Sequence, residues 1–593
     1  MIDRTTKLRW RRRFKKRRQQ VEDLSINAEQ GLETHFFKRL GRLMHVWRFA
    51  LSWLALLVLA AFGTVLQIRA LNQHYQTLQP APGGTYTEGI IGTFTSANPL
   101  YATSAADSSV ARLVFSGLMK YDMENNLVPD LAESISVDPS SKTYTVKLRT
   151  GAKWHDGKPV TVKDIMFTYG IIKNPDARSP FFNTWKDITV AEQDANTVVF
   201  TLPNALTTFP ETLTNGIVPV HILATLDPSQ LRTAGFNSVS PVGSGPFKWE
   251  KLEVSGSTQE SRQEIIGLLP NKEFYRESPK LGQFIIRTFR NEEQMVQAYE
   301  SGQLTSMVGL ASVPDNIRGV TDFNEYSVPL TGAVMVFFKT TQPPLDDVKI
   351  RRALVQGVEA STAAESLGYP VRLVKGPLLD SHVGFNPDLT QLPTDLAQAN
   401  KNLDEAGWIK DSDGTRRKGG QELTFTLHAQ NTSDYSAVTG YLQKAWKNLG
   451  IKVEVLLQND ADMQGVVGRH DYGSLLYGVS IGTDPDVFAY WHSSQAGPNS
   501  SARLNLSEYS SKIADQSLEA GRTRLDPAVR AIKYEPFLRA WREDAPALAL
   551  YQPTLLYVTR GKVYNFEPKS LNGITNRYVN VDNWMIRQEW VTK

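Results

Sequence analysis

The sequence predicts an α/β protein with one transmembrane helix close to its N-terminus. First, residues 49–66 form an apolar run without a single charge, long enough to cross most of a bilayer. Second, short strands are mixed with amphipathic helices through the rest of the 593 residues. Third, an amphipathic helix ends at Gly450 and leads directly into the alternating strand IKVEVLL, a unit typical of layered α/β domains.

The charge distribution near the N-terminus predicts the orientation of this helix. Residues 1–48 contain 14 Lys and Arg against 5 Asp and Glu, and only Arg69 follows closely on the other side. By the positive-inside rule, residues 1–48 form a basic cytoplasmic tail, residues 49–68 form the transmembrane anchor, and the large remainder lies outside the cytoplasm. Residues 85–593 carry 50 Lys and Arg against 56 Asp and Glu, which argues against a nucleic-acid-binding surface.

Two other interpretations of the apolar segment are a cleaved signal peptide and a lipoprotein signal. A cleaved signal usually has an apolar stretch of about 7 to 15 residues, so we expect this longer helix to stay in the mature protein. A lipoprotein needs a cysteine to carry the lipid, and the sequence contains none. The lack of cysteine also excludes disulfides, zinc-thiolate sites and cysteine nucleophiles. Residues 69–84, which end in PAPGG, are predicted to be a flexible linker.

Local signals predict where several helices of the outer part begin. A capping box pairs Thr161 with Asp164 at the start of one helix. A second helix follows Asn291, whose side chain suits the first position before a helix. A third has Asp346 and Asp347 at its N-terminal end, where carboxylates complement the helix dipole.

Motifs that suggest catalysis or metal binding have simpler structural interpretations. His155 and Asp156 are adjacent in a turn before Gly157, an arrangement that rarely works as a catalytic dyad. The segment DSDGTRRKGGQE (residues 411–422) places acids as a calcium loop does, but its glycine stands at position four instead of six, so we predict a hairpin turn. The sequence has no nucleophile elbow, Walker phosphate loop or HExxH zinc motif. We therefore expect no enzyme activity, no metal and no cofactor.

Nine segments of the outer part resemble, in sequence and in order, the family 5 extracellular solute-binding proteins of bacterial ABC importers, which bind oligopeptides, dipeptides or nickel. The most specific segment is YTVKLRTGAKWHDGKPVTVKDIMF (144–167). The others are SANPLY (96–101), VFSGLMKYD (114–122), LVPDLAES (127–134), PVGSGPFKW (241–249), PPLDDVKIRRAL (343–354), ANKNLDEAGW (399–408), GTDPDVF (482–488) and EDAPALALY (543–551).

The resemblance implies a two-lobed, periplasmic-binding-protein-like clamp in which one lobe carries an extra subdomain. Two chain crossings form the hinge, and by motif position they fall near Val328–Phe338 and Ala547–Leu556. The implied boundaries are residues 85–118, 240–330 and 550–593 for lobe I, 119–239 for its extra subdomain, and 331–549 for lobe II.

The same resemblance implies a function and partners. The chain is expected to be a monomeric, membrane-anchored substrate-binding subunit that captures peptides or peptide-like solutes by lobe closure and delivers them to an ABC permease and its ATPase. Binding of nucleic acid is not expected. Two alternatives stay open: the same fold with a non-peptide ligand, such as a nickel chelate or an oligosaccharide, and a surface sensor or structural protein without transport.

The stretch YGVSIGTDPDVFAYW (477–491) matches the segment that, in peptide-binding members, pairs with the main chain of an extended ligand. Those members place an aspartate three residues before the acid–Pro pair, against the ligand's ammonium group, whereas this chain has Ile481 there. Asp484 and Asp486 are possible substitutes, or caps of the following turn. Without a substitute, we expect a bound peptide to tolerate N-terminal acetylation. The predicted ligand-binding residues are Phe338, Tyr477, Gly478, Val479, Ile481, Asp484, Asp486 and Trp491.

Overall fold

A computed structural model describes residues 15–18, 47–258, 261–310, 312–500, 504–567 and 569–592. The chain divides into two compact units, one formed by the residues up to Gln79 together with Gln588–Lys593, the other by Pro80–Arg587. Most of the predicted basic tail, residues 1–48, lies outside the described residues.

The first unit contains the long apolar helix α3, Trp47–Tyr75. Its segment Trp47–Leu71 is long and apolar enough to cross a membrane, which is also true of a signal sequence. The prediction of a flexible linker over residues 69–84 is wrong for most of that range. No glycine or proline interrupts residues 67–75, so the helix continues through Tyr75, and β1 (Gln76–Ala81) then pairs with β23 (Arg587–Thr592).

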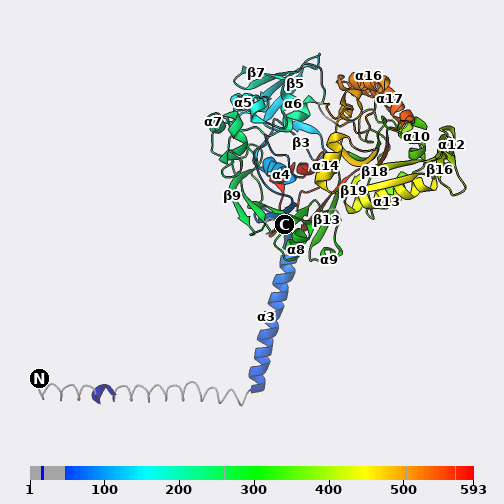
Figure 1. Ribbon diagram of the computed structural model, residues 1–593. Helices are drawn as coiled ribbons and strands as arrows, with labels where there is room; N and C mark the ends of the chain where they lie inside the picture. Colours follow the sequence, from blue (N-terminus) through cyan, green and yellow to red (C-terminus); the bar gives the residue numbers. More distant parts are fainter. Residues whose placement is uncertain are drawn as a thin grey trace, which may run out of the picture. The chain divides into compact units, whose positions relative to one another are not determined.

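The second unit is built around two large sheets (Figure 1). The first is seven-stranded, in the order β13-β22-β12-β2-β11-β10-β9. Its central strand β2 runs parallel to both β11 and β12, whereas the other neighbours are antiparallel. The strands are β2 (Thr85–Ile91), β9 (Phe247–Ser255), β10 (Gln263–Pro270), β11 (Gln283–Phe289), β12 (Ser306–Val308), β13 (Phe323–Pro329) and β22 (Thr554–Arg560), and α4 (Ala105–Val114), α8 (Glu292–Glu300) and α9 (Asp315–Arg318) accompany them.

The second large sheet is five-stranded, in the order β19-β18-β20-β14-β21. All seven residues of β14, GAVMVFF, are buried, because alternate side chains enter two different cores on opposite faces of the sheet. Its strands are β14 (Gly332–Phe338), β18 (Thr424–Gln430), β19 (Lys452–Gln458), β20 (Ser474–Ser480) and β21 (Ala547–Tyr551). Its helices are α10 (Val348–Gln356), α11 (Ala360–Glu365), α12 (Leu396–Glu405), α13 (Ser433–Asn448), α14 (Asp460–Arg469), α15 (Phe488–Trp491), α16 (Lys512–Arg522) and α17 (Pro527–Asp544).

A smaller four-stranded antiparallel sheet, ordered β5-β6-β8-β7, lies between β2 and β9 in the sequence. Its core includes Tyr169 stacked on Trp185 with ring centroids 4.0 Å apart. The elements of this region are β3 (Met119–Tyr121), β4 (Leu127–Pro129), β5 (Ala132–Val137), β6 (Thr143–Leu148), α5 (Val162–Ile172), α6 (Phe182–Trp185), β7 (Thr189–Asp194), β8 (Thr197–Thr201), the 3₁₀ helix η3 (Phe209–Thr214) and α7 (Val220–Leu223).

The chain passes between the two large sheets twice, from β13 to β14 and from β21 back to β22. The two crossings touch, because the Leu330 amide donates to the carbonyl of Pro553 at 2.8 Å. Gly332 is required for close packing here, since a Cβ would lie 2.7 Å from the carbonyl oxygen of Val479. These crossings fall within the predicted hinge segments. We call the parts around the seven-, five- and four-stranded sheets lobe I, lobe II and the extra subdomain, with the predicted boundaries as a proposal.

The local helix signals are confirmed. The capping box of Thr161 and Asp164 opens α5, and Asn291 accepts from the amide of Gln294 at the start of α8. Asp347 caps α10 through the amide of Lys349. Helix α13 ends before Gly450, which has a φ of +85° and leads into β19 as predicted.

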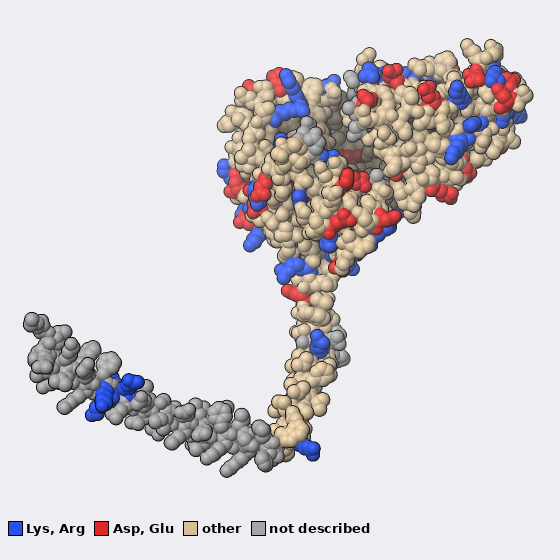
Figure 2. Space-filling view, turned by 60° about the horizontal axis from the view of Figure 1, so that its bottom comes forward, with Lys and Arg blue, Asp and Glu red and all other residues tan. Residues whose placement is uncertain are grey.

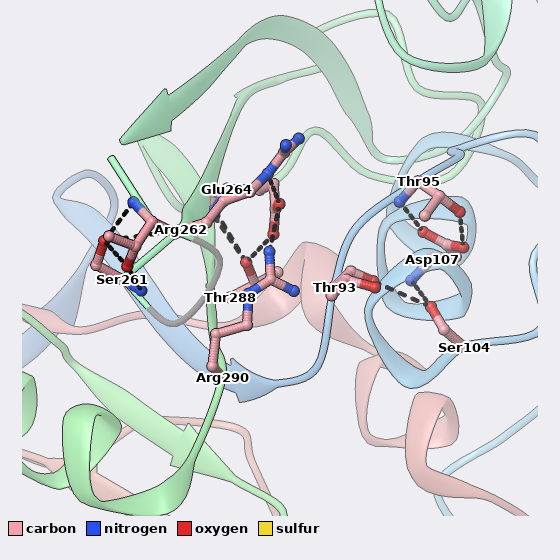
Figure 3. Close-up of polar contacts among 10 residues, drawn as sticks. Thr93, Thr95, Ser104, Asp107, Ser261, Arg262, Glu264, Thr288 and Arg290 are labelled. Atoms are coloured by element: carbon pink, nitrogen blue, oxygen red, sulfur yellow. Dashed lines mark hydrogen bonds and ion pairs between the residues drawn. The ribbon is translucent and has the colours of Figure 1, made fainter. Parts of the chain in front are cut away.

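Buried carboxylates fix the start of α4 relative to the first large sheet (Figure 3). Asp107 accepts from the amide and the hydroxyl of Thr95, both at 2.7 Å, and so holds the loop after β2 against this helix. On β10, Glu264 binds Arg262 at 2.9 Å and Arg290 at 3.0 Å. Satisfied buried charges of this kind favour one conformation, and the contacts of Asp107 hold the first turn of α4 against the loop after β2.

Candidate functional site

The folded body is hollowed between its two halves (Figure 2). One cavity, which we call the lobe I hollow, has a volume of about 470 Å³ and lies where α4 meets the extra subdomain. A second, the interlobe hollow, has about 630 Å³ and lies between residues 202–206 of the extra subdomain and the C-terminal end of α16. The two hollows share Thr184 in their linings, so they adjoin. Clefts of this size between domains are the usual places for small ligands.

Glu211 is the one acidic residue in the lining of the lobe I hollow. It lies on η3, whose Phe209 and Leu213 are buried, so the intervening Glu211 is left at the surface of the hollow. Its carboxylate makes one long contact, 3.5 Å from the hydroxyl of Thr483 on lobe II. Burial, together with the nearby carboxylates of Asp484 and Asp486, raises the pKa of Glu211 to about 7.

Arg112 is the one basic residue in the same lining. It lies in the last turn of α4, between buried Ala111 and Leu113, which anchor that turn in the core. Among the described residues, Arg112 makes no hydrogen bond and no ion pair within 4 Å; its guanidinium acts at longer range on Asp130. Burial raises the pKa of Asp130 to about 6, and Arg112 opposes that rise.

Asp484 and Asp486, the two predicted substitutes for the missing anchor, are both paired within lobe II. Asp484 forms a bidentate ion pair with Arg530 of α17, at 2.5 and 2.6 Å. Asp486 contacts Arg522 of α16 at 3.0 Å. Both also accept from main-chain amides two residues ahead, at 2.9 and 3.3 Å, so they cap the turn that leads into α15. Their charges are therefore already compensated inside the protein.

The main-chain edge predicted to pair with a ligand is open for part of its length, but side chains occupy it. Pairing of β20 with β18 ends at Leu476, whereas pairing with β14 continues to Ser480. Beyond Leu476, the hydroxyl of Tyr435 bonds the backbone of Gly478, and that of Tyr490 donates to the carbonyl of Ser480. A peptide that extends this sheet would have to displace both tyrosines.

The structure places several of the other predicted residues in or against the core of lobe II. Phe338 and Trp491 were expected to face a ligand, but both are buried, because Phe338 packs against Trp446 and Trp491 stacks on Phe337. Val479 and Ile481 lie in the same lobe II core as Trp491, and Tyr477 packs against it. None of the eight predicted residues lines either hollow. The described residues that do so and that the sequence did not indicate include Arg112, Glu211, Phe488, Glu519 and Arg522.

The two motifs interpreted as structural turns are confirmed as such. The acids of the 411–422 hairpin surround Arg417, which contacts Asp411, Asp413 and Glu422 at 2.6 to 2.9 Å. Asp156 pairs with His221 at 2.7 Å, and the His155 ring bonds the carbonyl of Gly245 at 3.0 Å. Within the described part of the chain, no three acidic or histidine side chains are grouped as a metal site.

Comparison with known proteins adds family evidence to this geometry. The model of the bacterial extracellular solute-binding proteins, family 5 middle region, matches residues 126–500. The oligopeptide-binding protein AppA of Bacillus subtilis is 25% identical over 526 residues, which cover 86% of this chain and 92% of AppA. The structure of AppA in complex with a nonapeptide covers 86% of this chain and all of AppA, with 23% identity and a TM-score of 0.69. The ABC transporter substrate-binding protein CtaP of Listeria monocytogenes covers 85% of this chain and 99% of CtaP, with 22% identity and a TM-score of 0.73.

Proposed function

Because the chain belongs to the family 5 bacterial extracellular solute-binding proteins, we propose that it is the substrate-binding subunit of an ABC importer that captures peptides or peptide-like solutes. Proteins of this family bind solutes and are not enzymes, in agreement with the lack of a catalytic motif. The permease and the ATPase are separate partners in this proposal.

The observation that carries the proposal is the interlobe hollow, which lies between parts joined by two short crossings and adjoins the lobe I hollow. The interlobe hollow is lined from the extra subdomain on one side and from α15 and α16 on the other. A ligand held between these parts stabilises the closed arrangement by its higher affinity for it, and the permease can recognise that arrangement.

The name of AppA supports peptides as the ligand class, since that relative is described as oligopeptide-binding. A second candidate, a non-peptide solute, is favoured by one observation. Tyr435 and Tyr490 occupy the main-chain groups of Gly478 and Ser480, to which an extended peptide would bond. A compact ligand that fills the hollows leaves these contacts intact.

We further propose that α3 keeps the protein at the cell membrane, with its N-terminus in the cytoplasm and its binding domain outside. The length and composition of Trp47–Leu71 support this arrangement, together with the excess of basic residues in the preceding segment. A lipid anchor is not needed when such a helix stays uncleaved.

Native mass spectrometry of the detergent-solubilised chain tests the ligand class directly. We expect a co-purified peptide or a mixture of peptides in the mass range of a few residues. A bound sugar, opine or metal chelate would replace the peptide proposal by the second candidate. Small-angle scattering that shows the same radius with and without a proven ligand would contradict capture by lobe closure.

A further inference from the structure

The lobe I hollow holds one carboxylate and one guanidinium that the protein leaves without a close partner of opposite charge. Glu211 has no ion pair within 4 Å among the described residues, and its one side-chain hydrogen bond is the 3.5 Å contact with Thr483. Arg112 has neither an ion pair within 4 Å nor a hydrogen bond with any described residue. Two such groups of opposite sign in one cavity are costly to keep partly buried unless a ligand compensates them.

We propose that the lobe I hollow binds a zwitterionic ligand, a short peptide with both termini free, whose ammonium group contacts Glu211 and whose carboxylate contacts Arg112. This inference rests on the proposed function and names the groups through which it recognises its ligand. It assigns the ammonium partner to the extra subdomain, although the sequence suggested the loop after β20.

The contrast with the other nearby acids supports the choice of Glu211. Asp484 is held by two short contacts with Arg530, and Asp486 by one with Arg522, so a ligand ammonium would have to compete with an arginine for either. Glu211 lies beside both, and the cation that acts on it, Arg530, is already held by Asp484 and makes no ion pair with Glu211 within 4 Å. A ligand ammonium placed there would also relieve the repulsion among the three carboxylates.

Arg112 suits the other end of the ligand. Its guanidinium carries five N–H donors in a planar arrangement that matches a carboxylate, and no described residue accepts from them. The lining of the same hollow includes Phe115, Phe181 and several threonines, a mixture of apolar surface and hydroxyl groups that accommodates a peptide backbone with small side chains. The volume of about 470 Å³ favours a short ligand.

The test measures binding of three matched probes to the full-length chain in detergent. The probes are an equimolar mixture of tripeptides with free termini, the same mixture acetylated at the N-terminus, and the same mixture amidated at the C-terminus. Binding is followed by native mass spectrometry and by the shift in melting temperature. The variants are Glu211→Gln, Arg112→Gln and Asp484→Asn, and the matched control is Glu192→Gln, an exposed glutamate on β7 of the same subdomain.

We expect wild type and Glu192→Gln to bind the free peptides about tenfold or more tightly than either modified mixture. Glu211→Gln should lose the preference over acetylated peptides and keep the preference over amidated ones, and Arg112→Gln should show the reverse. If wild type binds all three mixtures equally, or if Asp484→Asn and not Glu211→Gln removes the effect of acetylation, the inference is overturned while the proposed function stands. If wild type binds none of the mixtures, the peptide proposal itself fails, and the inference fails with it.

Discussion

Replacement of Glu211 by glutamine should change the stability of the ligand-free protein in a manner that depends on pH. In the folded chain the pKa of Glu211 is raised to about 7 from an ordinary value of 4.5, first by burial and then by Asp484 and Asp486, whereas Thr483 and Arg530 oppose the rise. The folded state therefore binds more protons than the unfolded state between pH 4.5 and 7. The stability contributed by this carboxyl is present below pH 4.5 and is lost as the pH rises through 7.

Glutamine cannot ionise, so the variant escapes this loss. A pKa rise from 4.5 to about 7 corresponds to an upper limit of about 3.4 kcal/mol at pH 8. Because Glu211 borders a hollow that solvent reaches, we expect a gain of about 1 to 2 kcal/mol at pH 8. At pH 5 most of the wild-type carboxyl is protonated, and the two proteins should unfold at nearly the same temperature.

The assay is thermal unfolding of the ligand-free chain in one detergent at pH 5 and pH 8, with Glu192→Gln as the control for loss of an exposed carboxylate. The variant should melt above wild type at pH 8 only, and the control should follow wild type at both values. A Glu211→Gln protein that is destabilised at pH 8, or that is stabilised equally at both pH values, would refute the assignment of a raised pKa to this residue.

Three further predictions address the paired acids, the ligand and the anchor. Arg530→Gln leaves Asp484 partly buried without its cation and should lower the free energy of unfolding, measured in urea, by about 3 kcal/mol. The double variant with Asp484→Asn should recover much of that loss. A double variant as unstable as the single one would contradict the pairing. A bound peptide should stabilise the protein by about 2.7 kcal/mol at a hundredfold excess over its dissociation constant, and a melting temperature that does not rise at that excess would contradict specific binding to the folded state. The membrane-bound protein should resist alkaline carbonate extraction, and Edman sequencing that begins after Leu66 would show that α3 is a cleaved signal.

Local sequence determined much of the secondary structure, because the groups that start or stop a helix lie within a few residues of one another. The oxygen of Thr161 and the carboxylate of Asp164 need only one helical turn to meet, and Gly450 can end α13 because its own backbone adopts a positive φ. The apolar character of β14 is also local, since burial on both faces of a sheet requires it. The order of nine family-like segments then indicated the clamp fold.

The linker and the aromatic residues show where local reasoning was insufficient. PAPGG suggested an irregular tether, but the strand β1 forms because β23, about 500 residues later in the sequence, supplies its hydrogen-bonding partner. Trp491 ends the suspected binding loop, and Phe338 ends a predicted hinge segment. The packing of helices on both faces of the five-stranded sheet, which no local pattern records, places both in the core.

The candidate site depended on tertiary structure for the same reason. From the sequence, Asp484 and Asp486 were candidate anchors because of their place beside Pro485, and only the positions of α16 and α17 bring Arg522 and Arg530 onto them. Arg112 and Glu211 belong to no motif, and only the tertiary fold brings α4 and η3, which are distant in sequence, to the lining of one hollow. The sequence determined the class of protein. Whether a charge is compensated depends on neighbours that are distant in sequence, so the fold decided which charges are free to bind a ligand.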